Sequence, residues 1–451
     1  MRSPSSAAST AEATTDVVNP RYAWYGDDFT GASDTLATVA QGGLRAFLFL
    51  GVPTAAHRAA VDALDALGIA GAARALAPAA MERELAPVAA FFATLGARVL
   101  HYKCCSTFDS APHVGNLGVA LRVLGAAASN RFVPIVGGQP GLGRYCAFGN
   151  LFAAAGDGAV HRIDRHPTMS VHPVTPMNEA DLRRHLAAQG IDPIALVDAR
   201  AFADGATLDA RFAQARASAA AVLFDALDDA HLAAIGRLLW QEAAHAPLLA
   251  LGASSVAQAL LASWPRAGGE APSRAAARFA GVPPSAGAVF VLAGSQSPVT
   301  AQQLEAARAY YEVVEIDVAT LAVEAGAIER TARNCARVLD AGRALLAHTG
   351  RARADGPPTA TVARLGGELL RRVLELAPQV RRIGVAGGDT SSLAIGALGI
   401  WGLQWTGAFG PGVSLLRARS DDARFDGVEL LLKGGQMGRV DLFERLLGGT
   451  G

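Results

Sequence analysis

The chain has 451 residues, 51% of them hydrophobic, and its 40 basic and 40 acidic residues cancel. This length predicts at least two domains, and the balanced charge argues against a nucleic-acid-binding protein, which needs a basic surface. No apolar run approaches the roughly 18 residues of a membrane helix, so we expect no association with a membrane.

In chain order, residues 1–19 come first and are expected to form a disordered tail. They are rich in Ser, Ala and Thr and lack the apolar core of a secretory signal. The four cysteines, at positions 104, 105, 146 and 335, form no CxxC pair. Both features predict a cytoplasmic protein with reduced thiols.

Residues 20–270 are predicted to form a first α/β domain. A short strand at 22–25 precedes a glycine-containing loop, a helix at 32–41 and a second strand at 45–50, which predicts a parallel strand pair. Further apolar strands are expected at 99–102, 132–136, 195–197, 221–224 and 248–251. Helical segments lie between most of them, a pattern that predicts a mainly parallel sheet.

A second α/β domain, again with a mainly parallel sheet, is predicted at 288–451. Prolines and glycines before it indicate a linker at 271–287. Its strands are expected at 288–293, 311–316, 344–347, 383–386 and 428–432. We expect the active site in a cleft between the two domains.

Glycine and serine loops follow several strands of the second domain. Ligands of open parallel sheets bind beyond the carboxyl ends of the strands, and backbone N–H groups at a helix start suit phosphate. In the central loop, Gly387 and Gly388 break a strand before a helix, and Asp389 adds a carboxylate. The predicted nucleotide contacts are Ser295, Ser297, Gly387, Gly388, Asp389, Thr390, Gly410, Lys433, Gly434 and Gly435.

Each of these loops also has a simpler interpretation. The two glycines can form a tight strand–helix turn, Ser297 can cap a helix that begins at Pro298, and the Lys433 loop can be a hairpin-like turn. Their joint occurrence after strands of one sheet favours a ligand site. None matches a Walker A or a Rossmann GxGxxG motif.

Charged and hydroxyl side chains follow the strands of the first domain. Carboxylates suit the hydroxyls of a small polyhydroxylated anion, and cations suit its carboxylate. The predicted substrate contacts are Asp27, Asp28, Thr30, Lys103, Ser106, Asp109, Gln139, Arg144, His172 and Thr175. One of the two adjacent aspartates can instead cap the next helix, and the His-Pro pairs within 161–177 indicate a rigid loop more than a metal site.

These motifs together resemble the four-carbon acid sugar kinase family. The matching pieces are 27–34, 105–110, 172–177, 294–300, 387–391 and 433–438, in the family's order and over nearly the whole chain beyond residue 20. The resemblance implies a sugar-acid-binding N-terminal domain, a nucleotide-binding C-terminal domain, and phosphorylation of a tetronate or 3-oxo-tetronate hydroxyl by ATP with Mg²⁺. It implies ATP contacts at Ser295, at 387–390 and at 434–435. The segment 138–169 is longer than in the family pattern, which leaves the sugar acid open.

We therefore expect an ATP-dependent kinase whose domains close on a small-molecule sugar acid. Asp389 and Asp28 are the candidates for the catalytic base, and Lys103 or Arg144 for the cation that holds the substrate carboxylate. Metal ligands are unassigned, and the oligomeric state is left open, with a homodimer as one possibility. The alternatives are an NAD-dependent sugar-acid oxidoreductase, which would carry GxGxxG, and a non-catalytic sugar-acid-binding protein, which would not need the glycine loops.

Overall fold

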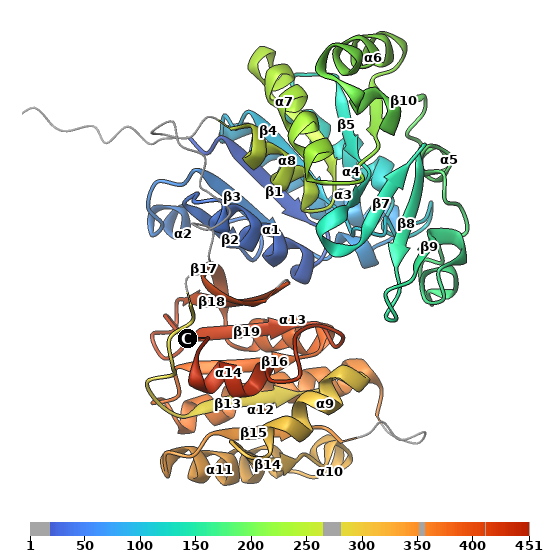
Figure 1. The fold of residues 1–451 in the computed structure, drawn as a ribbon. Coiled ribbons are helices and arrows are strands. Elements are labelled where there is room, and N and C mark those ends of the chain that lie inside the picture. The colour runs from blue at the N-terminus through green and yellow to red at the C-terminus, as the bar shows by residue number, and fades with distance from the viewer. Residues whose placement is uncertain (1–18, 265–280, 351–356, 411, 451) are drawn as a thin grey trace, which may run out of the picture.

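The computed structural model describes residues 19–264, 281–350, 357–410 and 412–450. The predicted tail, apart from Asn19, and most of the predicted linker lie outside the described residues. Two α/β halves lie one above the other, the N-terminal half in blue to green and the C-terminal half in yellow to red (Figure 1).

The N-terminal half is built on parallel strands in the order β10-β11-β5-β12-β4-β1-β3-β2. Their bounds are β1 Tyr22–Gly26, β2 Ala46–Phe49, β3 Ala66–Ala70, β4 Val99–Lys103, β5 Val133–Val136, β10 Ile194–Val197, β11 Ala221–Phe224 and β12 Leu248–Gly252. The helices are α1 Phe29–Gln41, α2 Ala55–Ala59, α3 Pro78–Thr94, α4 Leu117–Leu124, α5 Leu182–Ala187, α6 Gly205–Ser218, α7 Asp229–His245 and α8 Ser255–Ser263.

Strand β3 lies between β1 and β2, so the prediction that these two strands form a parallel pair is right about their direction and wrong about their direct pairing. The two strands are parallel, but each pairs with β3. The sequence gives little sign of β3, because three of its five residues are alanine or glycine. Gly68 is required there by packing, since a Cβ at this position would lie 2.2 Å from the Trp24 ring.

A separate antiparallel sheet of four strands flanks this half. It consists of β6 Gly138–Gln139, β7 Arg144–Ala147, β8 Asn150–Ala154 and β9 Val160–Arg162. The loop predicted at 161–177 is therefore wrong at its start, where 161–162 belong to β9. The buried Asp225 carboxylate holds the β7–β8 turn by accepting the N–H groups of Phe148 at 2.6 Å and Gly149 at 2.9 Å.

The C-terminal half has parallel strands in the order β19-β16-β13-β15-β14. They are β13 Val289–Ala293, β14 Glu312–Glu315, β15 Leu345–His348, β16 Arg382–Ala386 and β19 Glu429–Lys433. The helices are α9 Pro298–Ala307, α10 Val318–Val323, α11 Ala327–Asp340, α12 Thr359–Leu376, α13 Gly388–Ala397 and α14 Leu442–Gly448.

A long hairpin, β17 Ile400–Gly410 and β18 Val413–Ser420, joins the two halves. Strand β17 pairs antiparallel with β2 through Gly402↔Phe49 and Leu403↔Leu48, and β18 pairs with β19. One sheet of 15 strands thus runs through the molecule. Gly410, predicted to lie in a glycine loop of the nucleotide site, is instead the last residue of β17. Glycines at 402, 407 and 410 obscured the strand pattern in the sequence.

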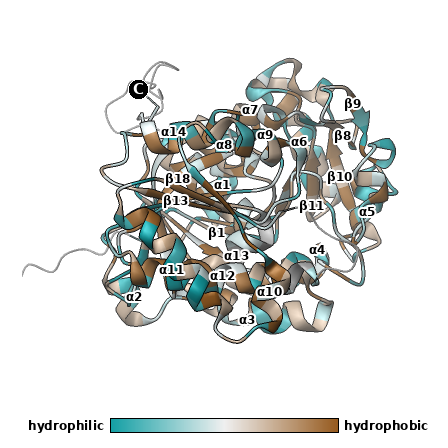
Figure 2. Ribbon diagram, turned by 90° about the horizontal axis from the view of Figure 1, so that it is seen from below, coloured by the Kyte–Doolittle hydropathy of each residue, from teal (hydrophilic) through white to brown (hydrophobic). Residues whose placement is uncertain are grey.

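The strands form the apolar centre of the molecule. Trp24 and Phe290, one from each half, are fully buried members of one hydrophobic cluster. Seen from below, the central strands are mostly brown, while helices such as α11 carry teal residues (Figure 2). Over the residues described, no helix combines the length and apolarity needed to cross a bilayer.

Candidate functional site

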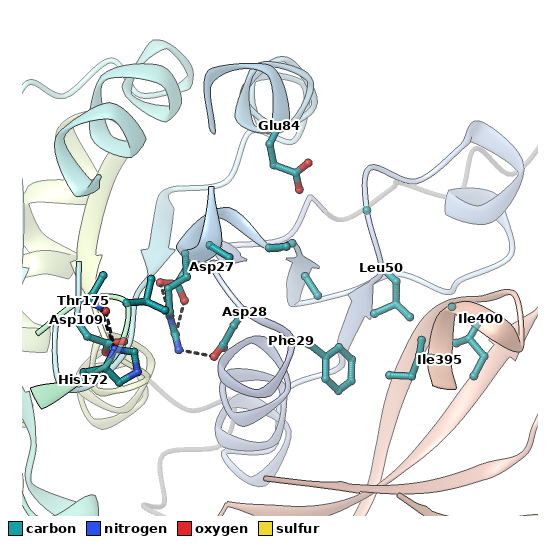
Figure 3. A pocket seen from close by; sticks show the side chains of 18 residues that line it. Asp27, Asp28, Phe29, Leu50, Glu84, Asp109, His172, Thr175, Ile395 and Ile400 are labelled. Carbon is teal, nitrogen blue, oxygen red and sulfur yellow. Dashed lines mark hydrogen bonds and ion pairs between the residues drawn. The ribbon is translucent and has the colours of Figure 1, made fainter. Parts of the chain in front are cut away.

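A cavity of about 610 Å³ lies at the carboxyl edge of the N-terminal strands, against the C-terminal half. The loops after β1, β2 and β3 line it, as predicted for an open α/β sheet. Ile395, at the end of α13, and Ile400, at the start of β17, close its other side (Figure 3). The side chains labelled there are Asp27, Asp28, Phe29, Leu50, Glu84, Asp109, His172, Thr175, Ile395 and Ile400.

Arg74 holds both aspartates of the loop after β1. Its Nη2 and Nε lie 2.7 and 3.2 Å from the two carboxylate oxygens of Asp27, and its Nη1 lies 2.6 Å from Oδ2 of Asp28. Burial raises the pKa of Asp27, and the charge of Arg74 opposes that shift. Sequence reasoning missed Arg74, because it follows the overlooked strand β3 and belongs to no motif.

Asp28 is also the N-cap of α1, since its Oδ1 accepts the N–H of Gly31 at 2.5 Å. The capping alternative therefore applies to Asp28, which lines the cavity as well. Thr30 lies exposed in the first turn of α1 and is not among the lining residues. The cap and the arginine together fix the Asp28 carboxylate at the cavity wall.

The loop after β4 contributes Asp109, whose Oδ1 accepts a 2.6 Å hydrogen bond from Thr107. Phe108, the residue before it, has a φ of 54°, a conformation that side chains other than glycine rarely adopt. Such backbone strain is typical of loops that hold a functional side chain. Lys103, where the strand ends, is buried, and Ser106 is half-buried outside the cavity lining.

The segment after the small sheet brings His172 and Thr175 to the cavity. The Nδ1 atom of His172 accepts the backbone N–H of Thr175 at 3.1 Å, which fixes the turn. The other two predicted contacts from this region are not in the lining: Gln139 is buried in β6, and Arg144 lies in β7 with its Nη1 donating to the carbonyl of Leu142. Five of the ten predicted substrate residues thus meet at the cavity.

The glycine loops of the C-terminal half converge. The N–H of Gly387 donates to the carbonyl of Lys433 at 2.9 Å, and the N–H of Ser295 donates to that of Ala386 at 3.1 Å. Gly387 has a φ of 129°, and a Cβ there would lie 3.0 Å from Oγ1 of Thr390. A Cβ on Gly435 would lie 2.5 Å from Oγ of Ser295, so these loops need glycine to approach each other.

Lys433 lies beneath these loops with only 2% of its surface exposed. Its ammonium group donates to Oγ1 of Thr300 at 2.8 Å and to the carbonyl of Gly435 at 3.2 Å. Burial lowers the pKa of Lys433 to about 8. The site therefore contains a buried positive charge next to backbone N–H groups, an arrangement that suits polyphosphate.

The remaining predicted nucleotide residues lie around this point. Ser297 caps α9 by accepting the N–H of Val299 at 3.2 Å, so the capping alternative holds for it. Gly388 and Asp389 form the first turn of α13, and Gly434 follows β19. Gly410 is the last residue of β17. Two positions later in the chain, a Cβ on Gly412 would lie 2.4 Å from Cε of Met437 in the 434–438 loop.

A metal ion has no ready-made protein cage in the ranges that the structure describes, where no group of three or more His, Cys, Asp or Glu side chains could hold one. Mg²⁺ usually binds through one or two carboxylates together with substrate phosphates and water. The residues present are compatible with a magnesium ion held largely by a bound nucleotide.

Comparisons with known proteins match both halves of the chain. The model of a sugar-binding N-terminal domain matches residues 22–260, and that of a nucleotide-binding C-terminal domain matches 290–443. A 3-oxo-isoapionate kinase from Paraburkholderia graminis is 38% identical over 93% of each chain. A 3-oxo-tetronate kinase from Methylobacterium radiotolerans is 32% identical over 93% of this chain and 97% of its own.

Solved structures share the fold. A Salmonella typhimurium LT2 protein, 25% identical, has a TM-score of 0.79 and covers 94% of this chain and 98% of its own. A Haemophilus influenzae protein, also 25% identical, has a TM-score of 0.72 with the same coverage.

Proposed function

The chain belongs to the four-carbon acid sugar kinase family, and on this premise we propose that it transfers the γ-phosphoryl group of ATP to a hydroxyl of a four-carbon sugar acid. Kinases acting on 3-oxo-tetronate and 3-oxo-isoapionate are its relatives. An NAD-dependent oxidoreductase and a non-catalytic binding protein are not favoured by these relatives.

One observation carries the proposal. Helix α13 begins among the glycine loops that suit phosphate, and its last turn, at Ile395 and Gly396, lines the cavity that contains the aspartates. A single helix of 10 residues therefore borders both sites. Such an arrangement supports transfer from a donor bound in one half to an acceptor bound in the other.

The nucleotide would bind with its phosphates at Gly387, Thr390, Gly434 and Gly435. The backbone N–H groups at the start of α13 and the ammonium of Lys433 would neutralise the phosphate charge. ATP fits because these loops exclude side chains at the points of closest approach. Magnesium, when bound, would supply further charge neutralisation on the β- and γ-phosphates.

The sugar acid would bind in the cavity of the N-terminal half. The carboxylates of Asp27, Asp28 and Asp109 can accept hydrogen bonds from its hydroxyl groups. In the reaction the acceptor oxygen bonds to the γ-phosphorus, the bond to the β–γ bridging oxygen breaks, and ADP leaves. The hydroxyl proton passes to a base, for which Asp28 and Asp389 are the candidates. Positioning and charge neutralisation supply most of the acceleration.

A coupled ADP-release screen over four- and five-carbon sugar acids tests this function. We expect turnover with at least one tetronate or 3-oxo-tetronate, dependent on ATP and Mg²⁺. Thermal shifts with Mg-ATP and with NAD serve as the control, because a ligand of the native state raises its melting temperature. Stabilisation by NAD alone, or no turnover on any acid, would contradict the proposal. Homodimer formation and a cytoplasmic location stay predictions.

A further inference from the structure

We propose that His185 is a positioning residue for Asp109, because it holds the carbonyl group of Phe108 in a strained loop. The inference rests on the proposed kinase function, in which the Asp109 carboxylate accepts a hydrogen bond from a hydroxyl of the sugar acid. It gives a role to two side chains, His185 and Gln189, that lie outside the motifs of the sequence. Neither lines the cavity, so their effect on the reaction passes through Asp109.

The loop after β4 has a backbone conformation that needs support. Phe108 has a φ of 54°, in the left-handed region that bulky residues avoid because Cβ comes too close to a carbonyl oxygen. Its ring is fully buried in the core of the N-terminal half, which anchors the side chain but leaves the backbone strained. Such strain persists only where the surrounding structure over-determines the conformation, so contacts that hold this backbone are required.

Two side-chain donors hold the carbonyl oxygen of Phe108. The hydroxyl of Ser110 donates to it at 2.9 Å, and Nε2 of His185 lies 3.1 Å from it. A carbonyl group and the N–H that follows it share one rigid peptide plane. The two donors therefore fix the plane from which Asp109 extends into the cavity lining (Figure 3).

Gln189 sets the direction of the Ser110 hydroxyl group. Its Oε1 accepts the backbone N–H of Leu117, at the start of α4, at 2.8 Å, so its amide nitrogen faces the other way. That nitrogen donates to Oγ of Ser110 at 2.9 Å, and the hydrogen of Ser110 is then directed at Phe108. One buried side chain thus connects the turn after α5, the start of α4 and the loop after β4.

His185 acts as a neutral donor. Burial lowers the pKa of His185, against the opposing effects of its hydrogen bond to Phe108 and of the Glu179 and Asp109 charges. A neutral imidazole carries one proton, and Nε2 must hold it, since a lone pair there would repel the carbonyl oxygen 3.1 Å away. Nε2 also lies 2.9 Å from Oγ of Ser110 and 3.0 Å from Nε2 of Gln189, which joins the three side chains into one cluster.

Helix α5 brings both side chains to the loop. The buried face of this helix and of the turn after it carries, at the i, i+3, i+4, i+7 spacing of a single stripe, the residues Leu182, His185, Leu186 and Gln189. Both leucines are fully buried. Polar residues in such a stripe are costly unless hydrogen bonds compensate, and the bonds of this pair go to the loop that carries Asp109.

The test compares His185→Leu, which removes the donor, with His185→Gln, whose amide nitrogen can donate from nearly the same place. D-threonate and D-erythronate are the acceptors, with Mg-ATP as the donor. In His185→Leu we expect kcat/KM for the acid to fall about 10- to 100-fold, because a misplacement of about 1 Å can cost two orders of magnitude, and the KM for ATP to change by less than about twofold. His185→Gln should keep most of the activity.

A double variant separates action through Asp109 from a general loss of stability. If His185 acts through this carboxylate, His185→Leu should cost little more once Asp109→Asn is present; additive losses would overturn the proposal. Asn130→Ala is the matched control, because it removes two hydrogen bonds, to Glu242 and Phe132, at the opposite end of the strands. An equal loss of kcat/KM in this control would also overturn it.

Thiol labelling reports on the loop without any substrate, so its result does not depend on the kinase function. Cys105 lies in this loop and is half-buried, whereas the other three cysteines are buried. In His185→Leu, Ellman's reagent should label Cys105 about 2- to 10-fold faster than in the wild type or Asn130→Ala, the range for local opening after loss of one hydrogen bond.

Faster labelling supports the positioning role even if neither acid is turned over, a result that would count against the kinase function alone. An unchanged labelling rate in His185→Leu overturns the positioning role and leaves the kinase function intact. If His185→Leu fails to fold, Ser110→Ala gives the decision, because it removes the other donor to the Phe108 carbonyl. Labelling at the wild-type rate in Ser110→Ala would then overturn the proposal.

Discussion

The ammonium of Lys433 donates a hydrogen bond of 2.8 Å to the hydroxyl of Thr300. The contact ties the end of β19 to α9 and holds a positive charge beneath the glycine loops. Since burial lowers the pKa of Lys433 to about 8, this charge is present at neutral pH and is lost in mildly alkaline solution. Loss of this charge at alkaline pH should weaken ATP binding but increase the free energy of unfolding.

Affinity for ATP should fall as the pH rises through about 8, because the phosphates lose a buried cation. The limiting slope is about tenfold per pH unit, and calorimetric titration of Mg-ATP between pH 7 and 9.5 would reveal it. In Lys433→Met the affinity should be lower at pH 7 and nearly independent of pH. A wild-type curve that stays flat to pH 9.5 would contradict a role for this charge.

The free energy of unfolding should respond to Lys433 in the other direction. Its folded pKa of about 8 lies below the ordinary value of 10.5, so between these values the unfolded chain keeps a proton that the folded chain has released. Stability therefore rises with pH in this window as far as this group is concerned. Denaturant unfolding at pH 7.5 and 9.5 should show a larger gain in the wild type than in Lys433→Met.

Gly387→Ala should impair nucleotide binding selectively. Its φ of 129° disfavours any side chain, and the added Cβ would lie 3.0 Å from Oγ1 of Thr390, so the backbone is strained and the Thr390 side chain must give way. We expect the KM for ATP to rise by about tenfold or more, with sugar-acid thermal shifts retained. Gly448→Ala is the matched control, because a Cβ there meets nothing within 4 Å. Equal effects of both substitutions would show a general loss of stability.

Arg74→Met should destabilise the fold strongly. It leaves the buried Asp27 carboxylate without its counter-charge, a change that costs about 3–5 kcal/mol, and chemical denaturation would measure it. Asp27→Asn in the same background should restore part of the loss, because the orphaned charge is then gone. No recovery in the double variant would argue against the ion pair as the cause.

Asp28→Asn and Asp389→Asn should separate the two candidate bases. Loss of a general base lowers the rate of the chemical step by about 10²- to 10⁴-fold, which single-turnover phosphorylation measures without interference from product release. The variant with the larger loss identifies the base. Near-normal rates in both would mean that neither carboxylate takes the proton.

The sequence predicted most strands of the parallel sheets, because buried strands read as short apolar runs separated by helices. It could not predict how the two sheets meet, since β17 is rich in glycine and pairs with a strand about 350 positions away in the chain. The cavity was predicted in part. Asp27 and Asp28 directly follow β1, and Asp109 lies in the loop after β4. Arg74 was not predicted. It follows the overlooked strand β3, and its ion pairs with Asp27 and Asp28 leave no pattern in the sequence around it.

The two-residue pairing between β2 and β17 also determines the distance between the two proposed ligands. Each half holds one of the proposed ligands, and backbone hydrogen bonds at Leu48↔Leu403 and Phe49↔Gly402 set how the halves align. A slip of one residue would shift one half by about 3.3 Å and turn the strand's side chains to the opposite face. Gly402 helps to fix this register, because a Cβ there would lie 2.3 Å from the ring of Phe47. Strand pairing at the edge of the cavity, where Leu50 and Ile400 line it, thus sets how far the phosphoryl group must travel.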